Sequence, residues 1–342
     1  MMRKKDVKMI ASTLADYLDT GMTMQDSVRR LDRAIPKYAG LFKDMAEALK
    51  NGTPLSRLME GYFGESFLTV MRAGEESGDL AKTMRDIEES IEIEMAVQKE
   101  VGRIYYPLGM LVAGLAVGFM FMIFVVPGIA ASLEEIENPI ILFSLMLSES
   151  IDQNYPYYVL GIIGVVGSIV IVLRSTTGKE VMFAAVTSIK FLRDPIIDLR
   201  FGVWARYMAM SVAAGIGTRD ALKMTADILP GELRKAVNKV RIDLENNIAM
   251  QDAVDLDRIP KNDPRQQYMP FFIINSFVTA AQTAKLDVAL YKSSPTLIKQ
   301  GKDKIERIVG IGRAIAIGVS AFVIIAPLGV IYGELFKALD NI

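Results

Sequence analysis

Residues 104–133 read IYYPLGMLVAGLAVGFMFMIFVVPGIAASL and contain no charged side chain. A helix needs about 20 apolar residues to cross the hydrocarbon core of a bilayer, so this run predicts a membrane span. Two further uncharged runs, residues 153–173 and 314–333, predict a second and a third span. Residues 269–284 are also uncharged, but this stretch is shorter and carries several polar side chains. We expect it to be a buried helix of a soluble domain.

The composition favours soluble domains interrupted by membrane spans. Of the 342 residues, 51% are hydrophobic and 23% are charged, a mixture too apolar for an ordinary soluble enzyme and too charged for a polytopic transporter. The chain has no cysteine and no histidine, which excludes disulfides, thiol nucleophiles, Cys-ligated metals and histidine bases. The net charge of −1 gives no overall signature of nucleic-acid binding. We predict no catalytic residue, no cofactor and no metal site.

The placement of basic residues predicts the orientation of the chain. Lysine and arginine are absent from residues 104–173 but frequent on the outer flanks of the three uncharged runs, and only acidic charges lie between the first two runs. Basic flanks mark the cytoplasmic side of a membrane. We therefore expect a cytoplasmic region at 1–103, spans at 104–133, 153–173 and 314–333, an outside loop at 134–152, a second cytoplasmic region at 174–313 and an outside tail at 334–342.

The two cytoplasmic regions resemble each other in sequence. Residues 18–28 (LDTGMTMQDSV) parallel residues 212–222 (VAAGIGTRDAL). In each copy a glycine is placed to end one helix, a threonine to cap the next, and an aspartate to lie in its first turn. The residues concerned are Gly21, Thr23 and Asp26 in the first copy, and Gly215, Thr218 and Asp220 in the second.

A second parallel supports the duplication. Residues 49–55 (LKNGTPL) match residues 244–250 (LENNIAM), and Thr53 and Pro54 fit the cap and the first position of a helix. Apolar residues recur at helical spacing in both copies, and no stretch alternates with the period of a strand. The predicted fold is all-α, with two homologous cytoplasmic bundles of about six helices each and three transmembrane helices.

The most distinctive string is AGEESGDL at residues 73–80. We interpret it as a corner between two helices, where one glycine permits close backbone approach, the next adopts a positive φ, and the aspartate caps the following helix. Two readings stay open: a plain corner with solvated glutamates, or a docking surface for a partner. The candidate residues are Gly74, Glu75, Glu76, Ser77, Gly78 and Asp79.

Small residues recur at four-residue spacing in two of the predicted spans. They are Gly114 and Gly118 in the first span, and Gly310, Ala314 and Gly318 at the third. Such faces let helices pack closely in lipid. Packing within one chain and packing between chains are equally compatible with this pattern.

The order of module, span, acidic loop, span, module and span, with the glycine corners and the string at residues 73–80, resembles the inner-membrane platform protein of type IV pilus and type II secretion systems. The resemblance covers nearly the whole chain. The second copy carries TAKLDVAL at residues 283–290 where the glycine–glutamate corner would recur, and the segment before the first module is short. Both features are similar to the type IVb branch, such as the toxin-coregulated pilus platform.

The resemblance implies a non-enzymatic protein of the bacterial inner membrane, with a periplasmic loop and C-terminus. It implies that the protein couples a cytoplasmic assembly ATPase to insertion of pilin into a growing fibre. The implied partners are that ATPase, pilin subunits, other inner-membrane pilus proteins, the lipid bilayer and further copies in a homo-oligomer, with no nucleic acid. The alternatives are a type II secretion platform, a membrane transport subunit, and a membrane-bound enzyme or sensor.

Overall fold

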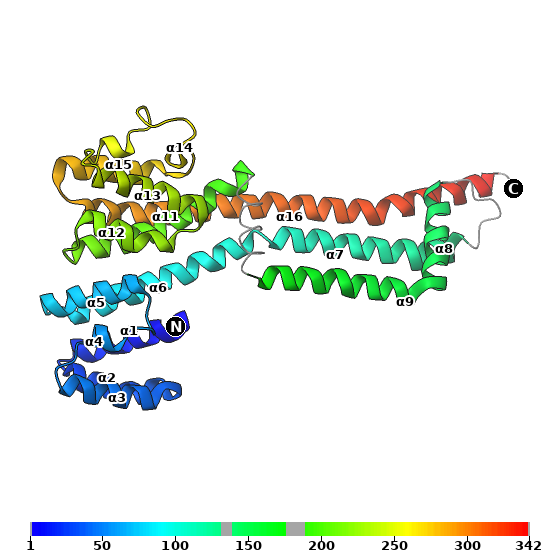
Figure 1. Ribbon diagram of the computed structural model, residues 1–342. Coiled ribbons are helices and arrows are strands. Elements are labelled where there is room, and N and C mark those ends of the chain that lie inside the picture. Colours follow the sequence, from blue (N-terminus) through cyan, green and yellow to red (C-terminus); the bar gives the residue numbers. More distant parts are fainter. Residues whose placement is uncertain (1, 131–138, 176–188, 341–342) are drawn as a thin grey trace. The chain divides into compact units, whose positions relative to one another are not determined.

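The computed structural model describes residues 2–130, 139–175 and 189–340, and every regular element in these ranges is helical (Figure 1). The chain divides into two compact units. The first unit contains the residues up to Glu100 together with Arg193–Asp303, and the second contains Val101–Leu192 and the residues from Lys304 onward. The all-α prediction is confirmed.

Module one, the part of the first unit up to Glu100, has six α-helices and one short 3₁₀ turn. Apolar residues at helical spacing form its core: Ile10 and Leu14 of the first helix pack with Met84 and Ile87 of the last. Met210 of the second module joins this same core. The helices are α1 (Lys4–Asp19), α2 (Met24–Ala34), η1 (Pro36–Tyr38), α3 (Ala39–Lys50), α4 (Leu55–Leu58), α5 (Glu65–Ser77) and α6 (Leu80–Arg103).

Module two, from α11 to Asp303, repeats this order. The uncharged stretch at residues 269–284 is a helix that buries Ile273, Phe277 and Ala280, as expected for a soluble domain. The elements are α11 (Lys190–Ala213), α12 (Thr218–Thr225), η3 (Ala226–Ile228), α13 (Gly231–Glu245), η4 (Asp252–Val254), α14 (Pro264–Tyr268), α15 (Phe271–Thr283) and the beginning of α16 (Leu286–Asp340).

Residues with positive φ recur at equivalent corners of the two modules. Gly21 and Gly215 have φ of 82° and 86°, Gly52 and Asn247 have 81° and 60°, and Gly78 and Ala284 have 76° and 56°. The helices before the last pair, α5 and α15, are each 13 residues long. The predicted duplication is therefore confirmed, even where alanine replaces glycine.

The two modules differ by one insertion. Ala284 follows Asn247 by 37 positions, whereas Gly78 follows Gly52 by 26. Module two therefore carries 11 more residues between these corners. With Asn247 aligned to Gly52, η4 corresponds to α4, so the extra chain lies between η4 and α15 and includes α14.

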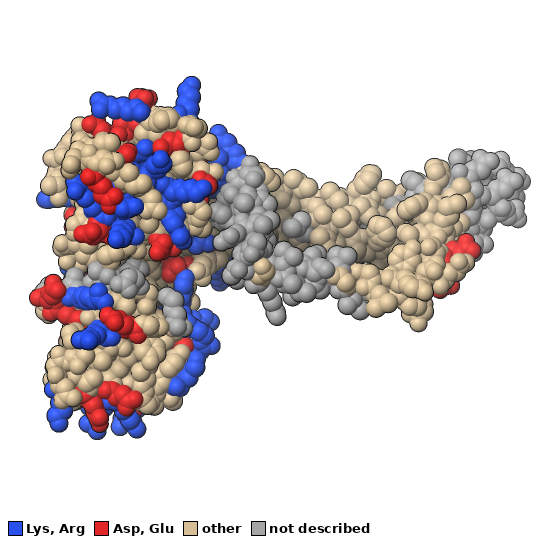
Figure 2. Space-filling view, in the orientation of Figure 1, with Lys and Arg blue, Asp and Glu red and all other residues tan. Residues whose placement is uncertain are grey.

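The second unit contains the apolar helices. It comprises α7 (Tyr106–Met120), a π-helical turn η2 (Phe121–Val125), α8 (Val126–Ala130), α9 (Pro139–Arg174) and the rest of α16. Two helices in the described residues are long and apolar enough to cross a membrane, Gly109–Ile129 and Leu286–Val330, and they contain most of the first and third predicted spans. In Figure 2 the charged side chains lie over the two modules, and few lie on this unit.

The described part of the predicted outside loop, residues 139–152, is helical. Residues 134–138 lie outside the described residues, but α9 begins at Pro139 and continues to Arg174. It bends at Asn154, which has φ −124° and ψ 21°. The part of α9 before the bend opens with a nearly continuous apolar run, and its only charges, Glu149 and Asp152, lie near the bend. The second predicted span, 153–173, falls in the later part of α9.

The two junctions between a helical module and the apolar segment that follows it differ from each other. α6 ends at Arg103, and two residues of tight turn separate it from α7, with the Tyr105 amide donating to the Gly102 carbonyl at 3.3 Å. Pro107 then lies in the first turn of α7, where its missing amide hydrogen costs nothing. By contrast, α16 is one uninterrupted helix of 55 residues.

Candidate functional site

The corner between α5 and α6 has the geometry that its sequence predicts. Gly78 ends α5 in the left-handed conformation, and the Asp79 carboxylate accepts from the Lys82 amide at 3.3 Å in the first turn of α6. A Cβ atom on Gly74 would overlap the Thr83 side chain, so glycine lets the two helices approach closely. The side chain of Ser77, the last residue of α5, lies outside the described residues.

The two adjacent glutamates of the corner have different surroundings. Glu75 accepts from the Ser56 amide at 3.0 Å and from the Ser56 hydroxyl at 2.5 Å. That amide belongs to the first turn of α4, where backbone donors have no partner within the helix and a negative charge is favoured. Glu76 is exposed. Of the two readings left open for this corner, solvated glutamates therefore describe Glu76 but not Glu75, which fastens α5 to α4.

Beside this contact lies a surface hollow of about 450 Å³. We call it the charged hollow, because ionisable side chains make up most of its lining. Glu60 and Arg72 form an ion pair at 2.9 Å, and Arg57 and Glu76 are exposed. The lining residues are Pro54, Ser56, Arg57, Glu60, Arg72, Glu75 and Glu76.

Module two has a hollow of about 530 Å³ at the equivalent place, without any ionisable lining residue. In the repeat alignment Gln251 stands where module one has Ser56, and Ala281 stands where it has Glu75. The carboxylate that fastens α5 to α4 is therefore missing from the second copy. The lining residues are Val212, Thr218, Ala249, Met250, Gln251, Ala280, Ala281, Ala284 and Leu286.

The capping prediction is confirmed at Thr23 and is partly wrong at the equivalent corner of module two. Thr23 caps α2 and accepts from the Asp26 amide at 3.1 Å. Thr218 is not the cap of α12: Gly217 occupies that position, and Thr218 is the first helical residue. Asp220 lies in the first turn as predicted.

The helix predicted to start within residues 49–55 begins one position later than expected. Pro54, not Thr53, is the cap residue of α4, and the helix begins at Leu55. Glu75 reaches this helix start from α5 and supplies the acceptor that a capping side chain would have supplied. A contact from a distant part of the chain therefore replaces the local cap.

The small residues of the first span pack within the chain. A Cβ atom on Gly114 would overlap Ser320, and one on Gly118 would overlap Val323, both on α16. The predicted equivalents on α16 do not behave this way. A Cβ atom on Gly310 or Gly318 would meet no described residue of a neighbouring helix within 4 Å, and α16 approaches the start of α7 closely at Gly312, against Pro107. Ala314 is likewise exposed.

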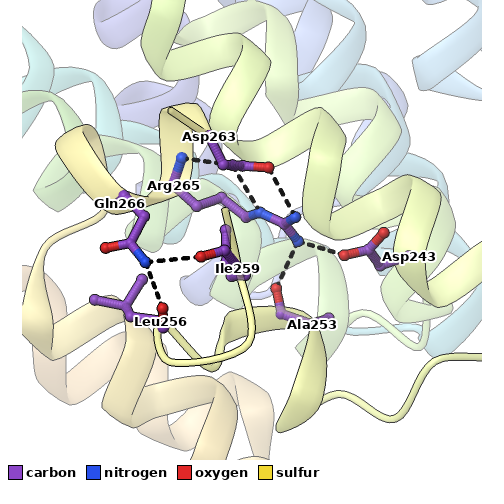
Figure 3. Close-up of polar contacts among 7 residues, drawn as sticks. All are labelled: Asp243, Ala253, Leu256, Ile259, Asp263, Arg265 and Gln266. Atoms are coloured by element: carbon purple, nitrogen blue, oxygen red, sulfur yellow. Dashed lines mark hydrogen bonds and ion pairs between the residues drawn. The ribbon is translucent and has the colours of Figure 1, made fainter. Parts of the chain in front are cut away.

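The insertion in module two is organised around a buried arginine that the sequence analysis did not single out. Arg265 is 5% exposed and donates to both carboxylate oxygens of Asp263 at 3.0 Å, to the Ala253 carbonyl at 2.8 Å, and to Asp243. Figure 3 shows the guanidinium between the two carboxylates, with Gln266 beside it donating to the carbonyls of the same loop. A local signal exists in the sequence, because Asp-Pro-Arg is typical of a helix start.

Electrostatics accounts for the ionisation of this pair. Burial alone would raise the pKa of Asp263, but the hydrogen bonds from the Arg265 side chain and amide outweigh it and hold that pKa below its ordinary value of 3.8. The carboxylate is therefore charged at neutral pH, and the buried guanidinium is neutralised. The arrangement satisfies buried charges and stabilises the inserted loop, which is a structural role.

The two modules are joined by polar contacts between α6 and α11. Arg206 of α11 is 3% exposed, binds Glu89, and lies with its guanidinium carbon 4.1 Å from the centroid of the Tyr291 ring. The Tyr207 hydroxyl donates to Glu94 at 3.2 Å. Burial raises the pKa of Tyr207, so the phenol stays protonated and can donate. These contacts link distant segments, and the spacing of the residues carried no signal for them.

Two helical modules in tandem, each followed by a helix able to cross a membrane, define a membrane protein built by duplication. The chain belongs to the family of the type II secretion system (T2SS) protein F, whose family model matches residues 10–127 and again residues 204–333. The chain is also 23% identical over 267 residues to the type 4 fimbrial assembly protein PilC of Pseudomonas putida. That alignment covers 73% of this chain and 65% of the relative.

Proposed function

We propose that this protein is the inner-membrane platform on which type IV pili are assembled, and that it passes work from a cytoplasmic ATPase to pilin subunits in the bilayer. The observation that carries the proposal is the double family match, in which each copy contains a helical module and most of an apolar helix. The name of the relative, a type 4 fimbrial assembly protein, favours pili over secretion. The type IVb branch is part of the proposal.

The proposed topology has three spans, both modules in the cytoplasm and the C-terminus in the periplasm. The absence of Lys and Arg from residues 104–173 supports this orientation. Since the chain has no cysteine, single cysteines report it directly. An impermeant maleimide applied to spheroplasts should label Ser148→Cys and leave Ser188→Cys unlabelled. The opposite labelling would overturn the topology.

The proposed role needs an energy source outside the chain. Extraction of an apolar helix from lipid costs free energy, since its side chains lose a hydrocarbon environment. The one sequence that approaches a phosphate-binding loop, residues 176–179, lacks the glycine that would be needed at position 173 and follows no predicted strand. The protein therefore acts as a non-enzymatic coupling element, and a partner ATPase supplies the work.

In module two, the first part of α16 packs closely on α11. The Ser294 hydroxyl donates to the Gly202 carbonyl of α11 at 2.8 Å. A Cβ atom on Gly202 would lie 2.6 Å from Ile298, and one on Gly301 would lie 2.6 Å from Leu199. These reciprocal glycines hold α11 and α16 in close contact. α16 continues as one helix to Asp340, and we propose it as the element that connects movements of module two to the apolar segment.

The charged hollow of module one is the proposed docking site for the ATPase. It offers Arg57 and Glu76 as exposed charges of opposite sign, within a frame fixed by the contact of Glu75 with Ser56. Exposed charges of this kind select partners and speed association. The equivalent hollow in module two has no charge, so the two modules present different surfaces to partners.

The test is retention of the cognate assembly ATPase by the purified full chain in nanodiscs. We expect the wild type to retain the ATPase, and Glu76→Lys combined with Arg57→Glu to lose most of that retention while its melting temperature stays unchanged. Glu47→Lys, an exposed change on α3 outside the hollow, is the matched control. Equal retention by all three would contradict docking at the charged hollow. Solute transport or nucleotide turnover by the chain alone would favour a transporter or an enzyme instead.

A further inference from the structure

The bend in α9 is built from side-chain contacts. The Asn154 side-chain amide donates to the Ser150 carbonyl at 3.2 Å, and the Ser150 and Tyr158 hydroxyls are 2.9 Å apart across the bend. Pro156 follows closely and has no backbone hydrogen to donate to the preceding turn. The parts of α9 before and after Asn154 therefore point in different directions, as Figure 1 shows.

The part before the bend, residues 139–152, has two contrasting faces. Ile141 is 1% exposed and packs with Val126 in a small apolar cluster at the end of the first apolar helix. The opposite face exposes Leu142, Phe143 and Met146, with 40%, 53% and 72% of their surfaces accessible. In a soluble protein such a row of exposed large apolar side chains would be costly.

Tyrosines gather at the bend itself. Tyr155, Tyr157 and Tyr158 are 64%, 75% and 42% exposed. Tyrosine concentrates at the level of lipid headgroups, because its ring is apolar and its hydroxyl needs a polar partner. The exposed apolar face thus continues directly into residues typical of the membrane surface, next to the end of a helix able to cross the membrane.

We propose that residues 139–152 form an interfacial helix, which lies in the boundary between headgroups and acyl chains with Leu142, Phe143 and Met146 in lipid. The inference rests on the proposed membrane placement of α7 and α16. Interfacial helices bury their apolar face about 5–10 Å into this boundary. The partner is lipid because the helix is anchored on Val126, at the end of the first span, and continues through the tyrosines into the rest of α9.

The interaction depends on apolar contact and not on charge. No lysine or arginine occurs from residue 104 through residue 173, so attraction to anionic headgroups contributes nothing. The charges of the segment, Glu149 and Asp152, lie at its end next to the bend. Insertion should therefore be the same in vesicles with and without an anionic lipid.

The test uses the full chain in vesicles of phosphatidylethanolamine and phosphatidylglycerol, with an environment-sensitive NBD label on single cysteines. Phe143→Cys and Met146→Cys should give blue-shifted emission, with roughly twofold stronger quenching by nitroxide lipids labelled near the headgroup than by lipids labelled near the chain end. Asp152→Cys is the control and should emit as in water. Val117→Cys, on the exposed side of α7, should be quenched most strongly by the deep nitroxide.

Each other outcome overturns the proposal. Blue-shifted emission at Phe143→Cys without quenching by either lipid would place the face against protein, such as a second copy. Emission as in water would place it in solvent. If Val117→Cys escapes the deep nitroxide, the membrane placement fails together with the interfacial helix. If Val117→Cys is quenched and Phe143→Cys is not, only the interfacial helix fails.

Discussion

Both carboxylate oxygens of Glu75 accept hydrogen bonds from Ser56, one from its backbone amide at 3.0 Å and one from its hydroxyl at 2.5 Å. Glu76, the next residue, is exposed. Successive residues of a helix point about 100° apart, so one glutamate faces α4 and the other faces solvent. The corner of module one thus separates a structural carboxylate from one that is exposed to solvent.

This separation predicts unequal effects of two similar substitutions. Glu75→Ala should lower the free energy of unfolding of module one by about 1–3 kcal/mol, because the Ser56 amide and hydroxyl lose their acceptor. Glu76→Ala should change it by about 0.5 kcal/mol or less. Denaturant unfolding of the detergent-solubilised chain measures both. Equal losses of stability would show that the contact with Ser56 contributes nothing.

The glycines of the same corner should be sensitive for two different reasons. Gly74→Val places a side chain where Thr83 lies, and Gly78→Val forces a β-branched residue into positive φ. Each should cost about 1–3 kcal/mol, more than Glu76→Ala.

A double-mutant cycle separates the two mechanisms. Thr83→Ala should recover part of the stability lost in Gly74→Ala, because it removes two of the three overlapping atoms, and none of that lost in Gly78→Ala. The melting temperatures of the single and double variants provide the comparison. Equal recovery at both glycines would contradict a specific close contact between Gly74 and Thr83.

The buried pair of Asp263 and Arg265 should make the free energy of unfolding depend on pH in the acid range. The pKa of Asp263 is lowered in the folded chain, so its contribution is complete above the unfolded pKa of about 3.9 and is lost as pH falls through the lower folded pKa. The free energy of unfolding should therefore decline below about pH 4 more steeply in the wild type than in Asp263→Asn. Parallel pH profiles would contradict this assignment.

Removal of the arginine itself should be more damaging at neutral pH. Arg265→Met leaves Asp243 and Asp263 without their shared partner and should cost about 3–5 kcal/mol. Arg258→Met is a suitable control, since that arginine also pairs with two aspartates but is largely exposed. A comparable loss in the control would show that burial of the Arg265 network is not the cause.

Close packing of α7 on α16 predicts a contrast between two glycines. Gly114→Leu should separate the helices, because Ser320 occupies the position of the new side chain, and should lower the thermal stability of the chain in detergent. A Cβ atom at position 310 would have no described residue of a neighbouring helix within 4 Å. Gly310→Leu should therefore leave that stability unchanged. A larger effect of Gly310→Leu on the monomer would contradict the observed packing of these helices.

Local sequence chemistry was sufficient for much of the fold. Gly21, Gly78 and Gly215 have positive φ where the sequence predicted helix ends, because few other residues adopt that conformation without strain. Helical spacing of apolar residues located the helices of both modules, and absence of charge located two apolar helices that the structure confirms. These signals depend only on neighbours along the chain.

Features that depend on distant residues carried no such signal. Ala284 has a positive φ, which alanine disfavours. The corner between α15 and α16 repeats the corner at Gly78 and requires that conformation. Glu75 reaches Ser56 across 19 positions, and Arg206 reaches Glu89 across 117. Residues 139–152 were predicted only as part of an outside loop between two spans, and their helical conformation was not predicted. Tertiary packing decides all of these.

The central claim, that this protein is a pilus assembly platform, is tested most directly by deletion of its gene. Electron microscopy should find no surface pili on the deletion cells, and an immunoblot should still detect mature pilin, because pilin synthesis and leader cleavage need neither the platform nor its ATPase. Expression of the wild-type chain should restore the fibres. Normal pili on the deletion cells would contradict the account, and accumulation of unprocessed pilin would indicate a processing role instead.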